Sequence, residues 1–163
     1  MNLVEPDLKV LDVMTLKPVI ASSDMSIRDV AALMDKYGVG SVVIKDDHDV
    51  VGIVTEPDFV RRAILEGMDF TNEPIKSIMT RDLITVSPGT DVADALNVMK
   101  DADVRHLPVL DDGKMVGFVT LKDILRVQPH LFDSWADVIR LREEHRKPIG
   151  GNPAILDEDF LDE

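Results

Sequence analysis

The chain repeats itself with a period of 65 residues. When residues 13–61 are laid on residues 78–126 without a gap, fourteen of the 49 positions carry the same amino acid. Many of the other positions exchange one apolar residue for another. A fixed period that holds over a whole unit indicates a repeated supersecondary module. We therefore predict two copies of one small module rather than a single large core.

Each copy predicts the same elements in the order β-α-β-β-α. Apolar residues recur with the 3.6-residue period of a half-buried helix after Ser26 and after Asp91, both of which are helix-capping residue types. Two β-rich runs follow in each copy and are joined by short Asp-rich turns typical of hairpins. A second helix is predicted directly after Thr55 or Thr120. The predicted strands are 18–21, 41–45 and 50–54, and in the second copy 83–86, 106–110 and 115–119.

A module of about 50 residues is only marginally stable alone, because it buries too little surface. We therefore expect an α/β (α+β) fold in which the two β-α-β-β-α motifs pack sheet to sheet about a pseudo-twofold axis. The predicted boundaries are 1–8 for an N-terminal segment, 9–68 and 69–126 for the two motifs, and 127–163 for a C-terminal helix and acidic tail. That helix is expected to be capped by Asp133 or Ser134 and to carry the one tryptophan, Trp135. Little order is expected in residues 150–163.

Composition narrows the classes of function. The formal net charge is −13, from 18 basic and 31 acidic residues, and a surface this acidic repels a nucleic-acid backbone. With no cysteine in the chain, disulfides, thiol nucleophiles and thiolate metal sites are excluded. The sequence contains no membrane-spanning run of about 18 uncharged apolar residues. Glu5 and Asp7 stand where a secretory signal would have basic residues, so we expect a cytoplasmic protein.

Several motifs resemble those of CBS (cystathionine β-synthase) domains. They are VMT at 13–15, IMT at 78–80, VVGIVTEPD at 50–58, LITVSPGTDVADAL at 83–96 and VRHLPVLDDGKMVGFVTLKD at 104–123. The resemblance covers about residues 9–126, and the second copy is the closer match. It implies a Bateman module, a regulatory pair that binds AMP, ADP, ATP or S-adenosylmethionine in the cleft between the copies. It also implies a homodimer in which four motifs form a flat disc.

A Gly-x-Val-Thr-x-x-Asp motif ends at Asp58 in the first copy and at Asp123 in the second, where a strand turns into a helix. Free backbone N–H groups at a helix start favour an anionic group, and the Thr hydroxyl can add a donor to phosphate. An ionised Asp one turn later can accept both hydroxyls of a ribose. The resemblance implies the same roles, with Thr55 and Thr120 near phosphate. The same pattern is also a helix-capping box, which needs no ligand.

The resemblance further implies that each Thr-x-x-Asp motif works with the first strand of the other copy. The implied cleft partners are Thr80 and Ile84 for Asp58, and Thr15 and Ile20 for Asp123. An isoleucine side chain can cover the face of an adenine ring, while the strand backbone can form hydrogen bonds to the edge of the ring. Ordinary core packing explains an isoleucine in a short strand equally well.

The two clefts are expected to differ in charge. Arg105 and His106 match the family's basic pair that meets phosphates, whereas uncharged residues stand at the equivalent positions of the first copy. A guanidinium offers a planar fork to phosphate oxygens, and His can add charge near neutral pH. We therefore expect the Asp58 cleft to be the better site for a phosphorylated ligand. Lys122, which lies inside the second motif, can also reach phosphate. Each residue also has an explanation that needs no ligand. Arg105 could form a surface ion pair, His106 could be a structural histidine on a strand edge, and Lys122 could be an exposed lysine at a helix start.

Neither catalysis nor a metal site is predicted. The four histidines share no ligand spacing, and neither Asp58 nor Asp123 has a flanking general base or metal pair. We predict a non-enzymatic regulatory protein that senses an adenosine-containing ligand and relays the bound state to a protein partner. The alternative is a scaffold CBS pair with empty clefts, which docks a protein through the acidic tail or the Trp135 helix. The identity of the nucleotide, the number of occupied clefts and the dimer arrangement stay open.

Overall fold

The computed structural model describes residues 7–145 and divides the chain into two units. The first unit runs to Pro129 and contains both sequence repeats. The second begins at His130 and contains the end of the 3-10 helix η3 (Pro129–Leu131) and the helix α6 (Phe132–His145). Among the described residues, no helix is both long enough and apolar enough to span a membrane.

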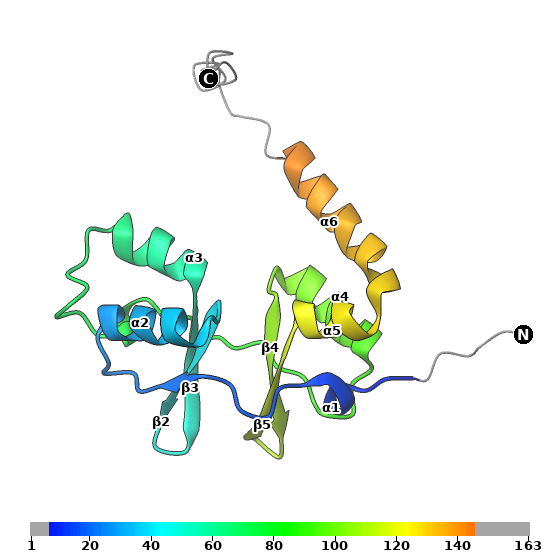
Figure 1. Cartoon of the computed structure of the whole chain (residues 1–163), viewed down its shortest axis with the longest axis horizontal. Coiled ribbons are helices and arrows are strands. Elements are labelled where there is room, and N and C mark those ends of the chain that lie inside the picture. The colour runs from blue at the N-terminus through cyan, green and yellow to red at the C-terminus, as the bar shows by residue number, and fades with distance from the viewer. Residues whose placement is uncertain (1–6, 146–163) are drawn as a thin grey trace, which may run out of the picture. The chain divides into compact units, whose positions relative to one another are not determined.

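The first copy folds in the predicted order β-α-β-β-α (Figure 1). Its elements are α1 (Val10–Val13), β1 (Ile20–Ala21), α2 (Ile27–Tyr37), β2 (Ser41–Asp46), β3 (Asp49–Thr55), α3 (Glu56–Asp58) and the π-helix η1 (Phe59–Ile64). Strand β1 pairs in parallel with β2, and β2 pairs antiparallel with β3. The result is a three-stranded sheet in the order β1-β2-β3.

The second copy repeats this plan with one strand reduced. Its elements are the 3-10 helix η2 (Ile75–Ser77), α4 (Val92–Ala102), β4 (His106–Asp111), β5 (Lys114–Thr120) and α5 (Leu121–Val127). The predicted strand at 83–86 is a single parallel bridge between Val86 and Val109, and β1 is half the predicted length. Proline has no N–H to donate, so Pro18 and Pro88 limit how far these short pairings extend.

The start of each copy completes the sheet of the other. Thr15 bridges Phe118 on β5: the Thr15 N–H donates to the Phe118 carbonyl at 2.7 Å, and the Phe118 N–H donates back at 2.9 Å. Thr80 bridges Ile53 on β3 in the same way, with N···O distances of 2.8 and 3.0 Å. The two modules are therefore interlocked through exchanged segments.

Glycine makes these exchanged bridges possible. A Cβ atom at Gly52 would lie 2.6 Å from Sδ of Met79 and 3.0 Å from the Thr80 carbonyl oxygen. A Cβ atom at Gly117 would collide with Met14 in the same manner. The Met-Thr pair at the start of one copy therefore fits against the Gly-x-Val-Thr motif of the other, and only glycine leaves the room.

Hydrophobic residues fill both faces of the strands. On the helix side of the first sheet, Val42, Ile44 and Val54 belong to a cluster that also includes residues of α2 and η1 and the buried Met79. On the other side, Val43 and Ile53 pack with Phe118 of the second copy. Burial on both faces explains why these strands are continuous apolar runs. The predicted sheet-to-sheet packing of two motifs is thus confirmed (Figure 1).

Both copies begin their first long helix after the predicted capping residue. The Ser26 hydroxyl accepts a hydrogen bond from the Asp29 N–H at 3.0 Å and caps α2. Asp91 stands at the N-cap of α4 but makes no side-chain capping bond, and its carboxylate pairs with Lys9 at 2.5 Å.

Asp133 and Ser134 do not cap α6, because the turn η3 leads directly into a helix that begins earlier, at Phe132. Trp135 in the first turn of α6 is buried. The tail predicted for residues 150–163 lies outside the described residues.

Replacing Gly52 by alanine is expected to lower the free energy of unfolding by about 1–3 kcal/mol, because the new methyl group overpacks the Met79–Thr80 segment. Gly89→Ala is the matched control, since a Cβ atom there meets no heavy atom within 4 Å, and it should stay within about 0.5 kcal/mol of wild type. Urea unfolding of the three proteins measures both values. If Gly52→Ala and Gly89→Ala were equally stable, the close packing of Met79 and Thr80 against Gly52 would not contribute to stability.

Candidate functional site

Each Thr-x-x-Asp motif forms a capping box at the turn from strand to helix. In the first copy, the Thr55 N–H and hydroxyl donate to Oδ2 of Asp58 at 2.9 and 3.1 Å. In the second copy, the corresponding Thr120 bonds to Asp123 are 3.0 and 2.8 Å. There the Asp123 N–H also donates to the Thr120 hydroxyl at 3.1 Å. The alternative reading of the motif as a helix cap is therefore realised in both copies.

The capping boxes leave one oxygen of each aspartate available. Among the described residues, no hydrogen bond reaches Oδ1 of Asp58 or of Asp123, and only 14% of either side chain is exposed. An arginine faces each Oδ1 at 3.6 Å, Arg62 for Asp58 and Arg126 for Asp123. Each turn thus presents a largely buried carboxylate that still has acceptor capacity, which is the chemistry needed to bind hydroxyl groups.

The threonine hydroxyls are already engaged. The Thr55 hydroxyl hydrogen points to Asp58, and the Thr120 hydroxyl hydrogen points to Asp123. Either hydroxyl can donate to a phosphate only after it releases the aspartate. The phosphate role that the resemblance implied for both threonines therefore stays a prediction.

Thr80 and Thr15 lie beside the motifs of the opposite copies. Thr80 bridges Ile53, two residues before Thr55, and Thr15 bridges Phe118, two residues before Thr120. Their backbone is therefore held next to the strand that leads into each turn.

Ile20 and Ile84 are both exposed. Exposed apolar side chains of this kind are available to cover a flat ring. Their role as adenine contacts stays a prediction.

His106 connects the two copies electrostatically. It starts β4 opposite Thr120, and its ring stacks on Phe118 with the centroids 5.9 Å apart. Burial lowers the pKa of His106 below 6.5, and the negative charge of Asp58 in the other copy partly opposes this. Burial therefore favours the neutral imidazole and Asp58 favours the charged one, and the phosphate role expected for His106 stays a prediction.

The other basic candidates are exposed. Arg105 is exposed, and its carbonyl accepts the N–H of Leu121 at 2.8 Å at the start of α5. Lys122 is exposed in the first turn of the same helix. Neither side chain has a described contact with Asp58 or Asp123. No group of three or more His, Cys, Asp or Glu side chains able to hold a metal ion occurs among the described residues.

Arg62 was not among the predicted site residues, but the structure gives it specific contacts. In addition to facing Asp58, its Nη1 donates to the carbonyl oxygens of Ile78 at 2.9 Å and Met79 at 3.2 Å. The signal in the sequence is a break in the repeat, because Val127 stands at the equivalent position of the second copy.

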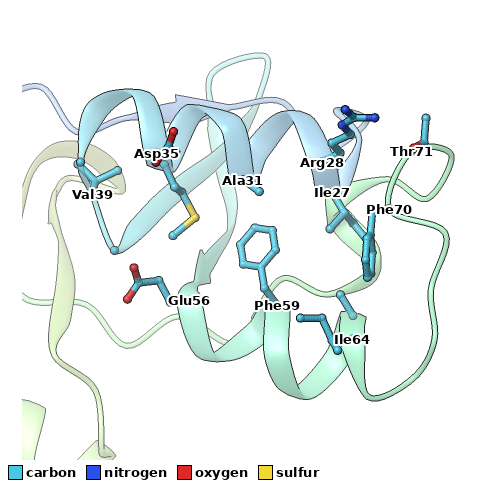
Figure 2. A pocket seen from close by; sticks show the side chains of 14 residues that line it. Ile27, Arg28, Ala31, Asp35, Val39, Glu56, Phe59, Ile64, Phe70 and Thr71 are labelled. Carbon is cyan, nitrogen blue, oxygen red and sulfur yellow. The ribbon is translucent and has the colours of Figure 1, made fainter.

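A groove of about 980 Å³ lies between α2 and the α3–η1 segment (Figure 2). Phe59 lies in its middle, with Arg28 and Ile64 toward one end and Asp35 and Glu56 toward the other. None of the predicted site residues lines this groove, but Glu56 belongs to the Thr55–Asp58 turn. The groove therefore adjoins the first Thr-x-x-Asp turn without including its threonine or its aspartate.

Comparisons with known proteins agree with this architecture. The family model "CBS domain" matches residues 10–64 and again 75–130. An uncharacterised protein of Methanopyrus kandleri is 37% identical over 121 residues, which cover 73% of this chain and 59% of that relative. A crystal structure of an uncharacterised conserved protein from Pyrococcus horikoshii aligns with a TM-score of 0.71 and 32% identity, over 77% of this chain and 95% of that one.

A second structural neighbour contains bound ligands. The CBS domain pair of protein MJ0100, in complex with 5′-methylthioadenosine and S-adenosyl-L-methionine, aligns with a TM-score of 0.67 and 31% identity. The alignment covers 74% of this chain and 98% of that chain. With both repeats matched by the family model, the chain belongs to the CBS-domain family. It is a CBS pair.

The partly buried His106 should make the protein less stable in acid. Because its pKa is lower in the folded state than the ordinary value of 6.5, the unfolded state binds more protons as the pH falls through 6.5. The free energy of unfolding is therefore expected to fall with decreasing pH more steeply in wild type than in His106→Gln. Urea unfolding between pH 7.5 and about pH 5 measures this. If the free energy of unfolding fell equally with pH in both proteins, the lowered pKa of His106 in the folded state would be contradicted.

Proposed function

We propose that this CBS pair is a non-enzymatic regulatory sensor that binds an adenosine-containing ligand at the Asp58 site, which consists of Thr55, Asp58, Thr80 and His106. Ligands of this class are S-adenosylmethionine, methylthioadenosine, AMP, ADP and ATP. The observation that carries the proposal is the pair of largely buried aspartate carboxylates, each with an oxygen free of hydrogen bonds among the described residues. An adjacent pair of ribose hydroxyls fits such an acceptor.

The similarity to the MJ0100 pair supports the choice of ligand class. That pair was crystallised with S-adenosyl-L-methionine and 5′-methylthioadenosine and shares 31% of its sequence with this chain. Both of its ligands contain an adenosine group and lack phosphate.

Signalling would work through a population shift. A ligand that touches Asp58 of one copy and the neighbourhood of His106 in the other bridges the two copies. It then favours whichever arrangement of the copies it binds more tightly, and the size of the response is limited by that difference in affinity. A protein partner that recognises the favoured arrangement would read the signal.

Thermal unfolding with each of the five ligands tests the proposal. A ligand at about 100 times its Kd should stabilise the fold by about 2.7 kcal/mol, which raises Tm by several degrees. Asp58→Asn should reduce this shift, because it removes the charge and keeps an oxygen to accept the Thr55 N–H. Asp29→Asn, on the exposed face of α2, is the matched control and should respond like wild type. A Tm unaffected by all five ligands would favour the scaffold alternative, in which the motifs serve as helix caps.

We also propose that the groove of Figure 2 is covered by a second copy of the chain, giving the homodimer expected for this family. Four large apolar side chains on or next to the groove are exposed: Val60, Ile64, Leu65 and Phe70. Apolar patches of this kind mark interaction surfaces.

Light scattering after size-exclusion chromatography tests the dimer. Wild type should elute with about twice the 18.1 kDa mass of the chain, and Ile64→Asp should shift it toward the monomer because it places a charge in the groove. Leu11→Asp, at an exposed apolar residue of α1 that does not line the groove, is the control and should remain dimeric. A monomeric wild type would overturn the proposal.

A further inference from the structure

We propose that Arg62 is a positioning residue of the Asp58 site: it holds the segment Ile78–Thr80 against Asp58 and thereby makes this site the tighter of the two. The inference rests on the proposed function, since it concerns the affinity of the same site. It assigns a role to a side chain that the repeat pattern alone places on a helix surface.

The contacts of Arg62 span two parts of the chain. Its Nε lies 3.6 Å from Oδ1 of Asp58, while its Nη1 donates to the carbonyl oxygens of Ile78 and Met79 at 2.9 and 3.2 Å. The planar guanidinium can do both because its donors point outward in a fixed fork. One side chain therefore links the aspartate to the two peptide groups that precede Thr80.

The segment that Arg62 holds is the exchanged segment of the second copy. Thr80 bridges Ile53 on β3, and the side chain of Met79 fills the space left by Gly52. Hydrogen bonds from a charged donor are stronger than neutral ones. Arg62 therefore restrains the backbone at the point where the second copy reaches the Asp58 site.

The second copy has no equivalent restraint. Val127 replaces Arg62 in the repeat, and the arginine that faces Asp123 is Arg126, which is 72% exposed against 48% for Arg62. Among the described residues, Arg126 forms an ion pair with Asp123 and bonds to no distant segment of the chain.

The difference follows the helix type. In η1 the Leu65 N–H donates to Val60, five residues back, whereas in α5 the Gln128 N–H donates to Ile124, four residues back. The π-type turn takes one more residue than the α-type turn. The arginine that faces the aspartate accordingly comes four residues after Asp58 but three residues after Asp123.

An exposed ion pair between residues four apart on a helix has little effect by itself. The long-range hydrogen bonds to Ile78 and Met79, 16 and 17 residues away, distinguish Arg62 from such a pair. The inference therefore depends on those two bonds and predicts an effect on the Thr80 segment, not only on the stability of η1.

The first measurement needs no ligand. Amide hydrogen exchange by NMR compares wild type with Arg62→Ala, Arg62→Lys and the neighbouring control Arg61→Ala. Exchange at Thr80 and Ile53 should rise by about tenfold in Arg62→Ala, because the hydrogen bonds from a charged donor are lost. Arg62→Lys keeps the charge but loses the planar set of guanidinium donors. Its exchange rates at Thr80 and Ile53 should therefore lie between those of wild type and Arg62→Ala. Exchange at Thr15 and Phe118 should not change.

The second measurement is S-adenosylmethionine affinity by isothermal titration calorimetry. The Asp123→Asn background isolates the Asp58 site, and the Asp58→Asn background isolates the other site. Arg62→Ala should weaken binding at the Asp58 site by about tenfold and leave the Asp123 site within about twofold, while Arg61→Ala changes neither. Methylthioadenosine serves as the second probe in the same design.

Three results would overturn the inference: unchanged exchange at Thr80, changed exchange with unchanged affinity at the Asp58 site, or equal weakening of both sites. The last would mean that Arg62 acts on overall stability. If wild type binds neither probe, the proposed adenosyl function fails, and the exchange measurement still decides whether Arg62 positions the Thr80 segment.

Discussion

The fit of a methionine from one copy against a glycine of the other is the constraint on which the rest of this structure depends. Met79 occupies the space above Gly52, and Met14 occupies the space above Gly117. These contacts allow Thr80 and Thr15 to bridge the opposite sheets, and they bring the two inner faces together around Phe118. The same glycines are the first residues of the Gly-x-Val-Thr-x-x-Asp motifs. The methionine–glycine contacts therefore also place Thr80 and Thr15 near the turns that carry the two aspartates.

The Thr-x-x-Asp motif combines two roles that the sequence alone could not separate. Oδ2 of each aspartate is committed to the helix cap, and Oδ1 is left for another partner. A cap fixes the carboxylate in place before any ligand arrives, which lowers the cost of binding. The cap is therefore compatible with the proposed ribose contact and supplies the preorganisation that such a contact needs.

The local features of the fold were predictable, as was the packing of the two copies, but individual long-range side-chain contacts were not. The periodicity of α2, its Ser26 cap and both hairpins follow from residues close together in sequence. The pairing of Asp91, the N-cap residue of α4, with Lys9 joins residues 82 positions apart and has no local sequence pattern. The role of Arg62 depends likewise on carbonyl groups of a distant segment, and the π-type winding of η1 has no simple sequence pattern. Repeat comparison still marked the position, because Val127 breaks the symmetry there.

A crystal structure of the protein grown with S-adenosylmethionine tests the central claim most directly. The account predicts electron density for the ligand at the Asp58 site, with both ribose hydroxyls within hydrogen-bond distance of the Asp58 carboxylate and the Thr55 cap intact. Ligand bound elsewhere, for example in the groove between α2 and η1, with Asp58 contacting only Thr55 and Arg62, would contradict it.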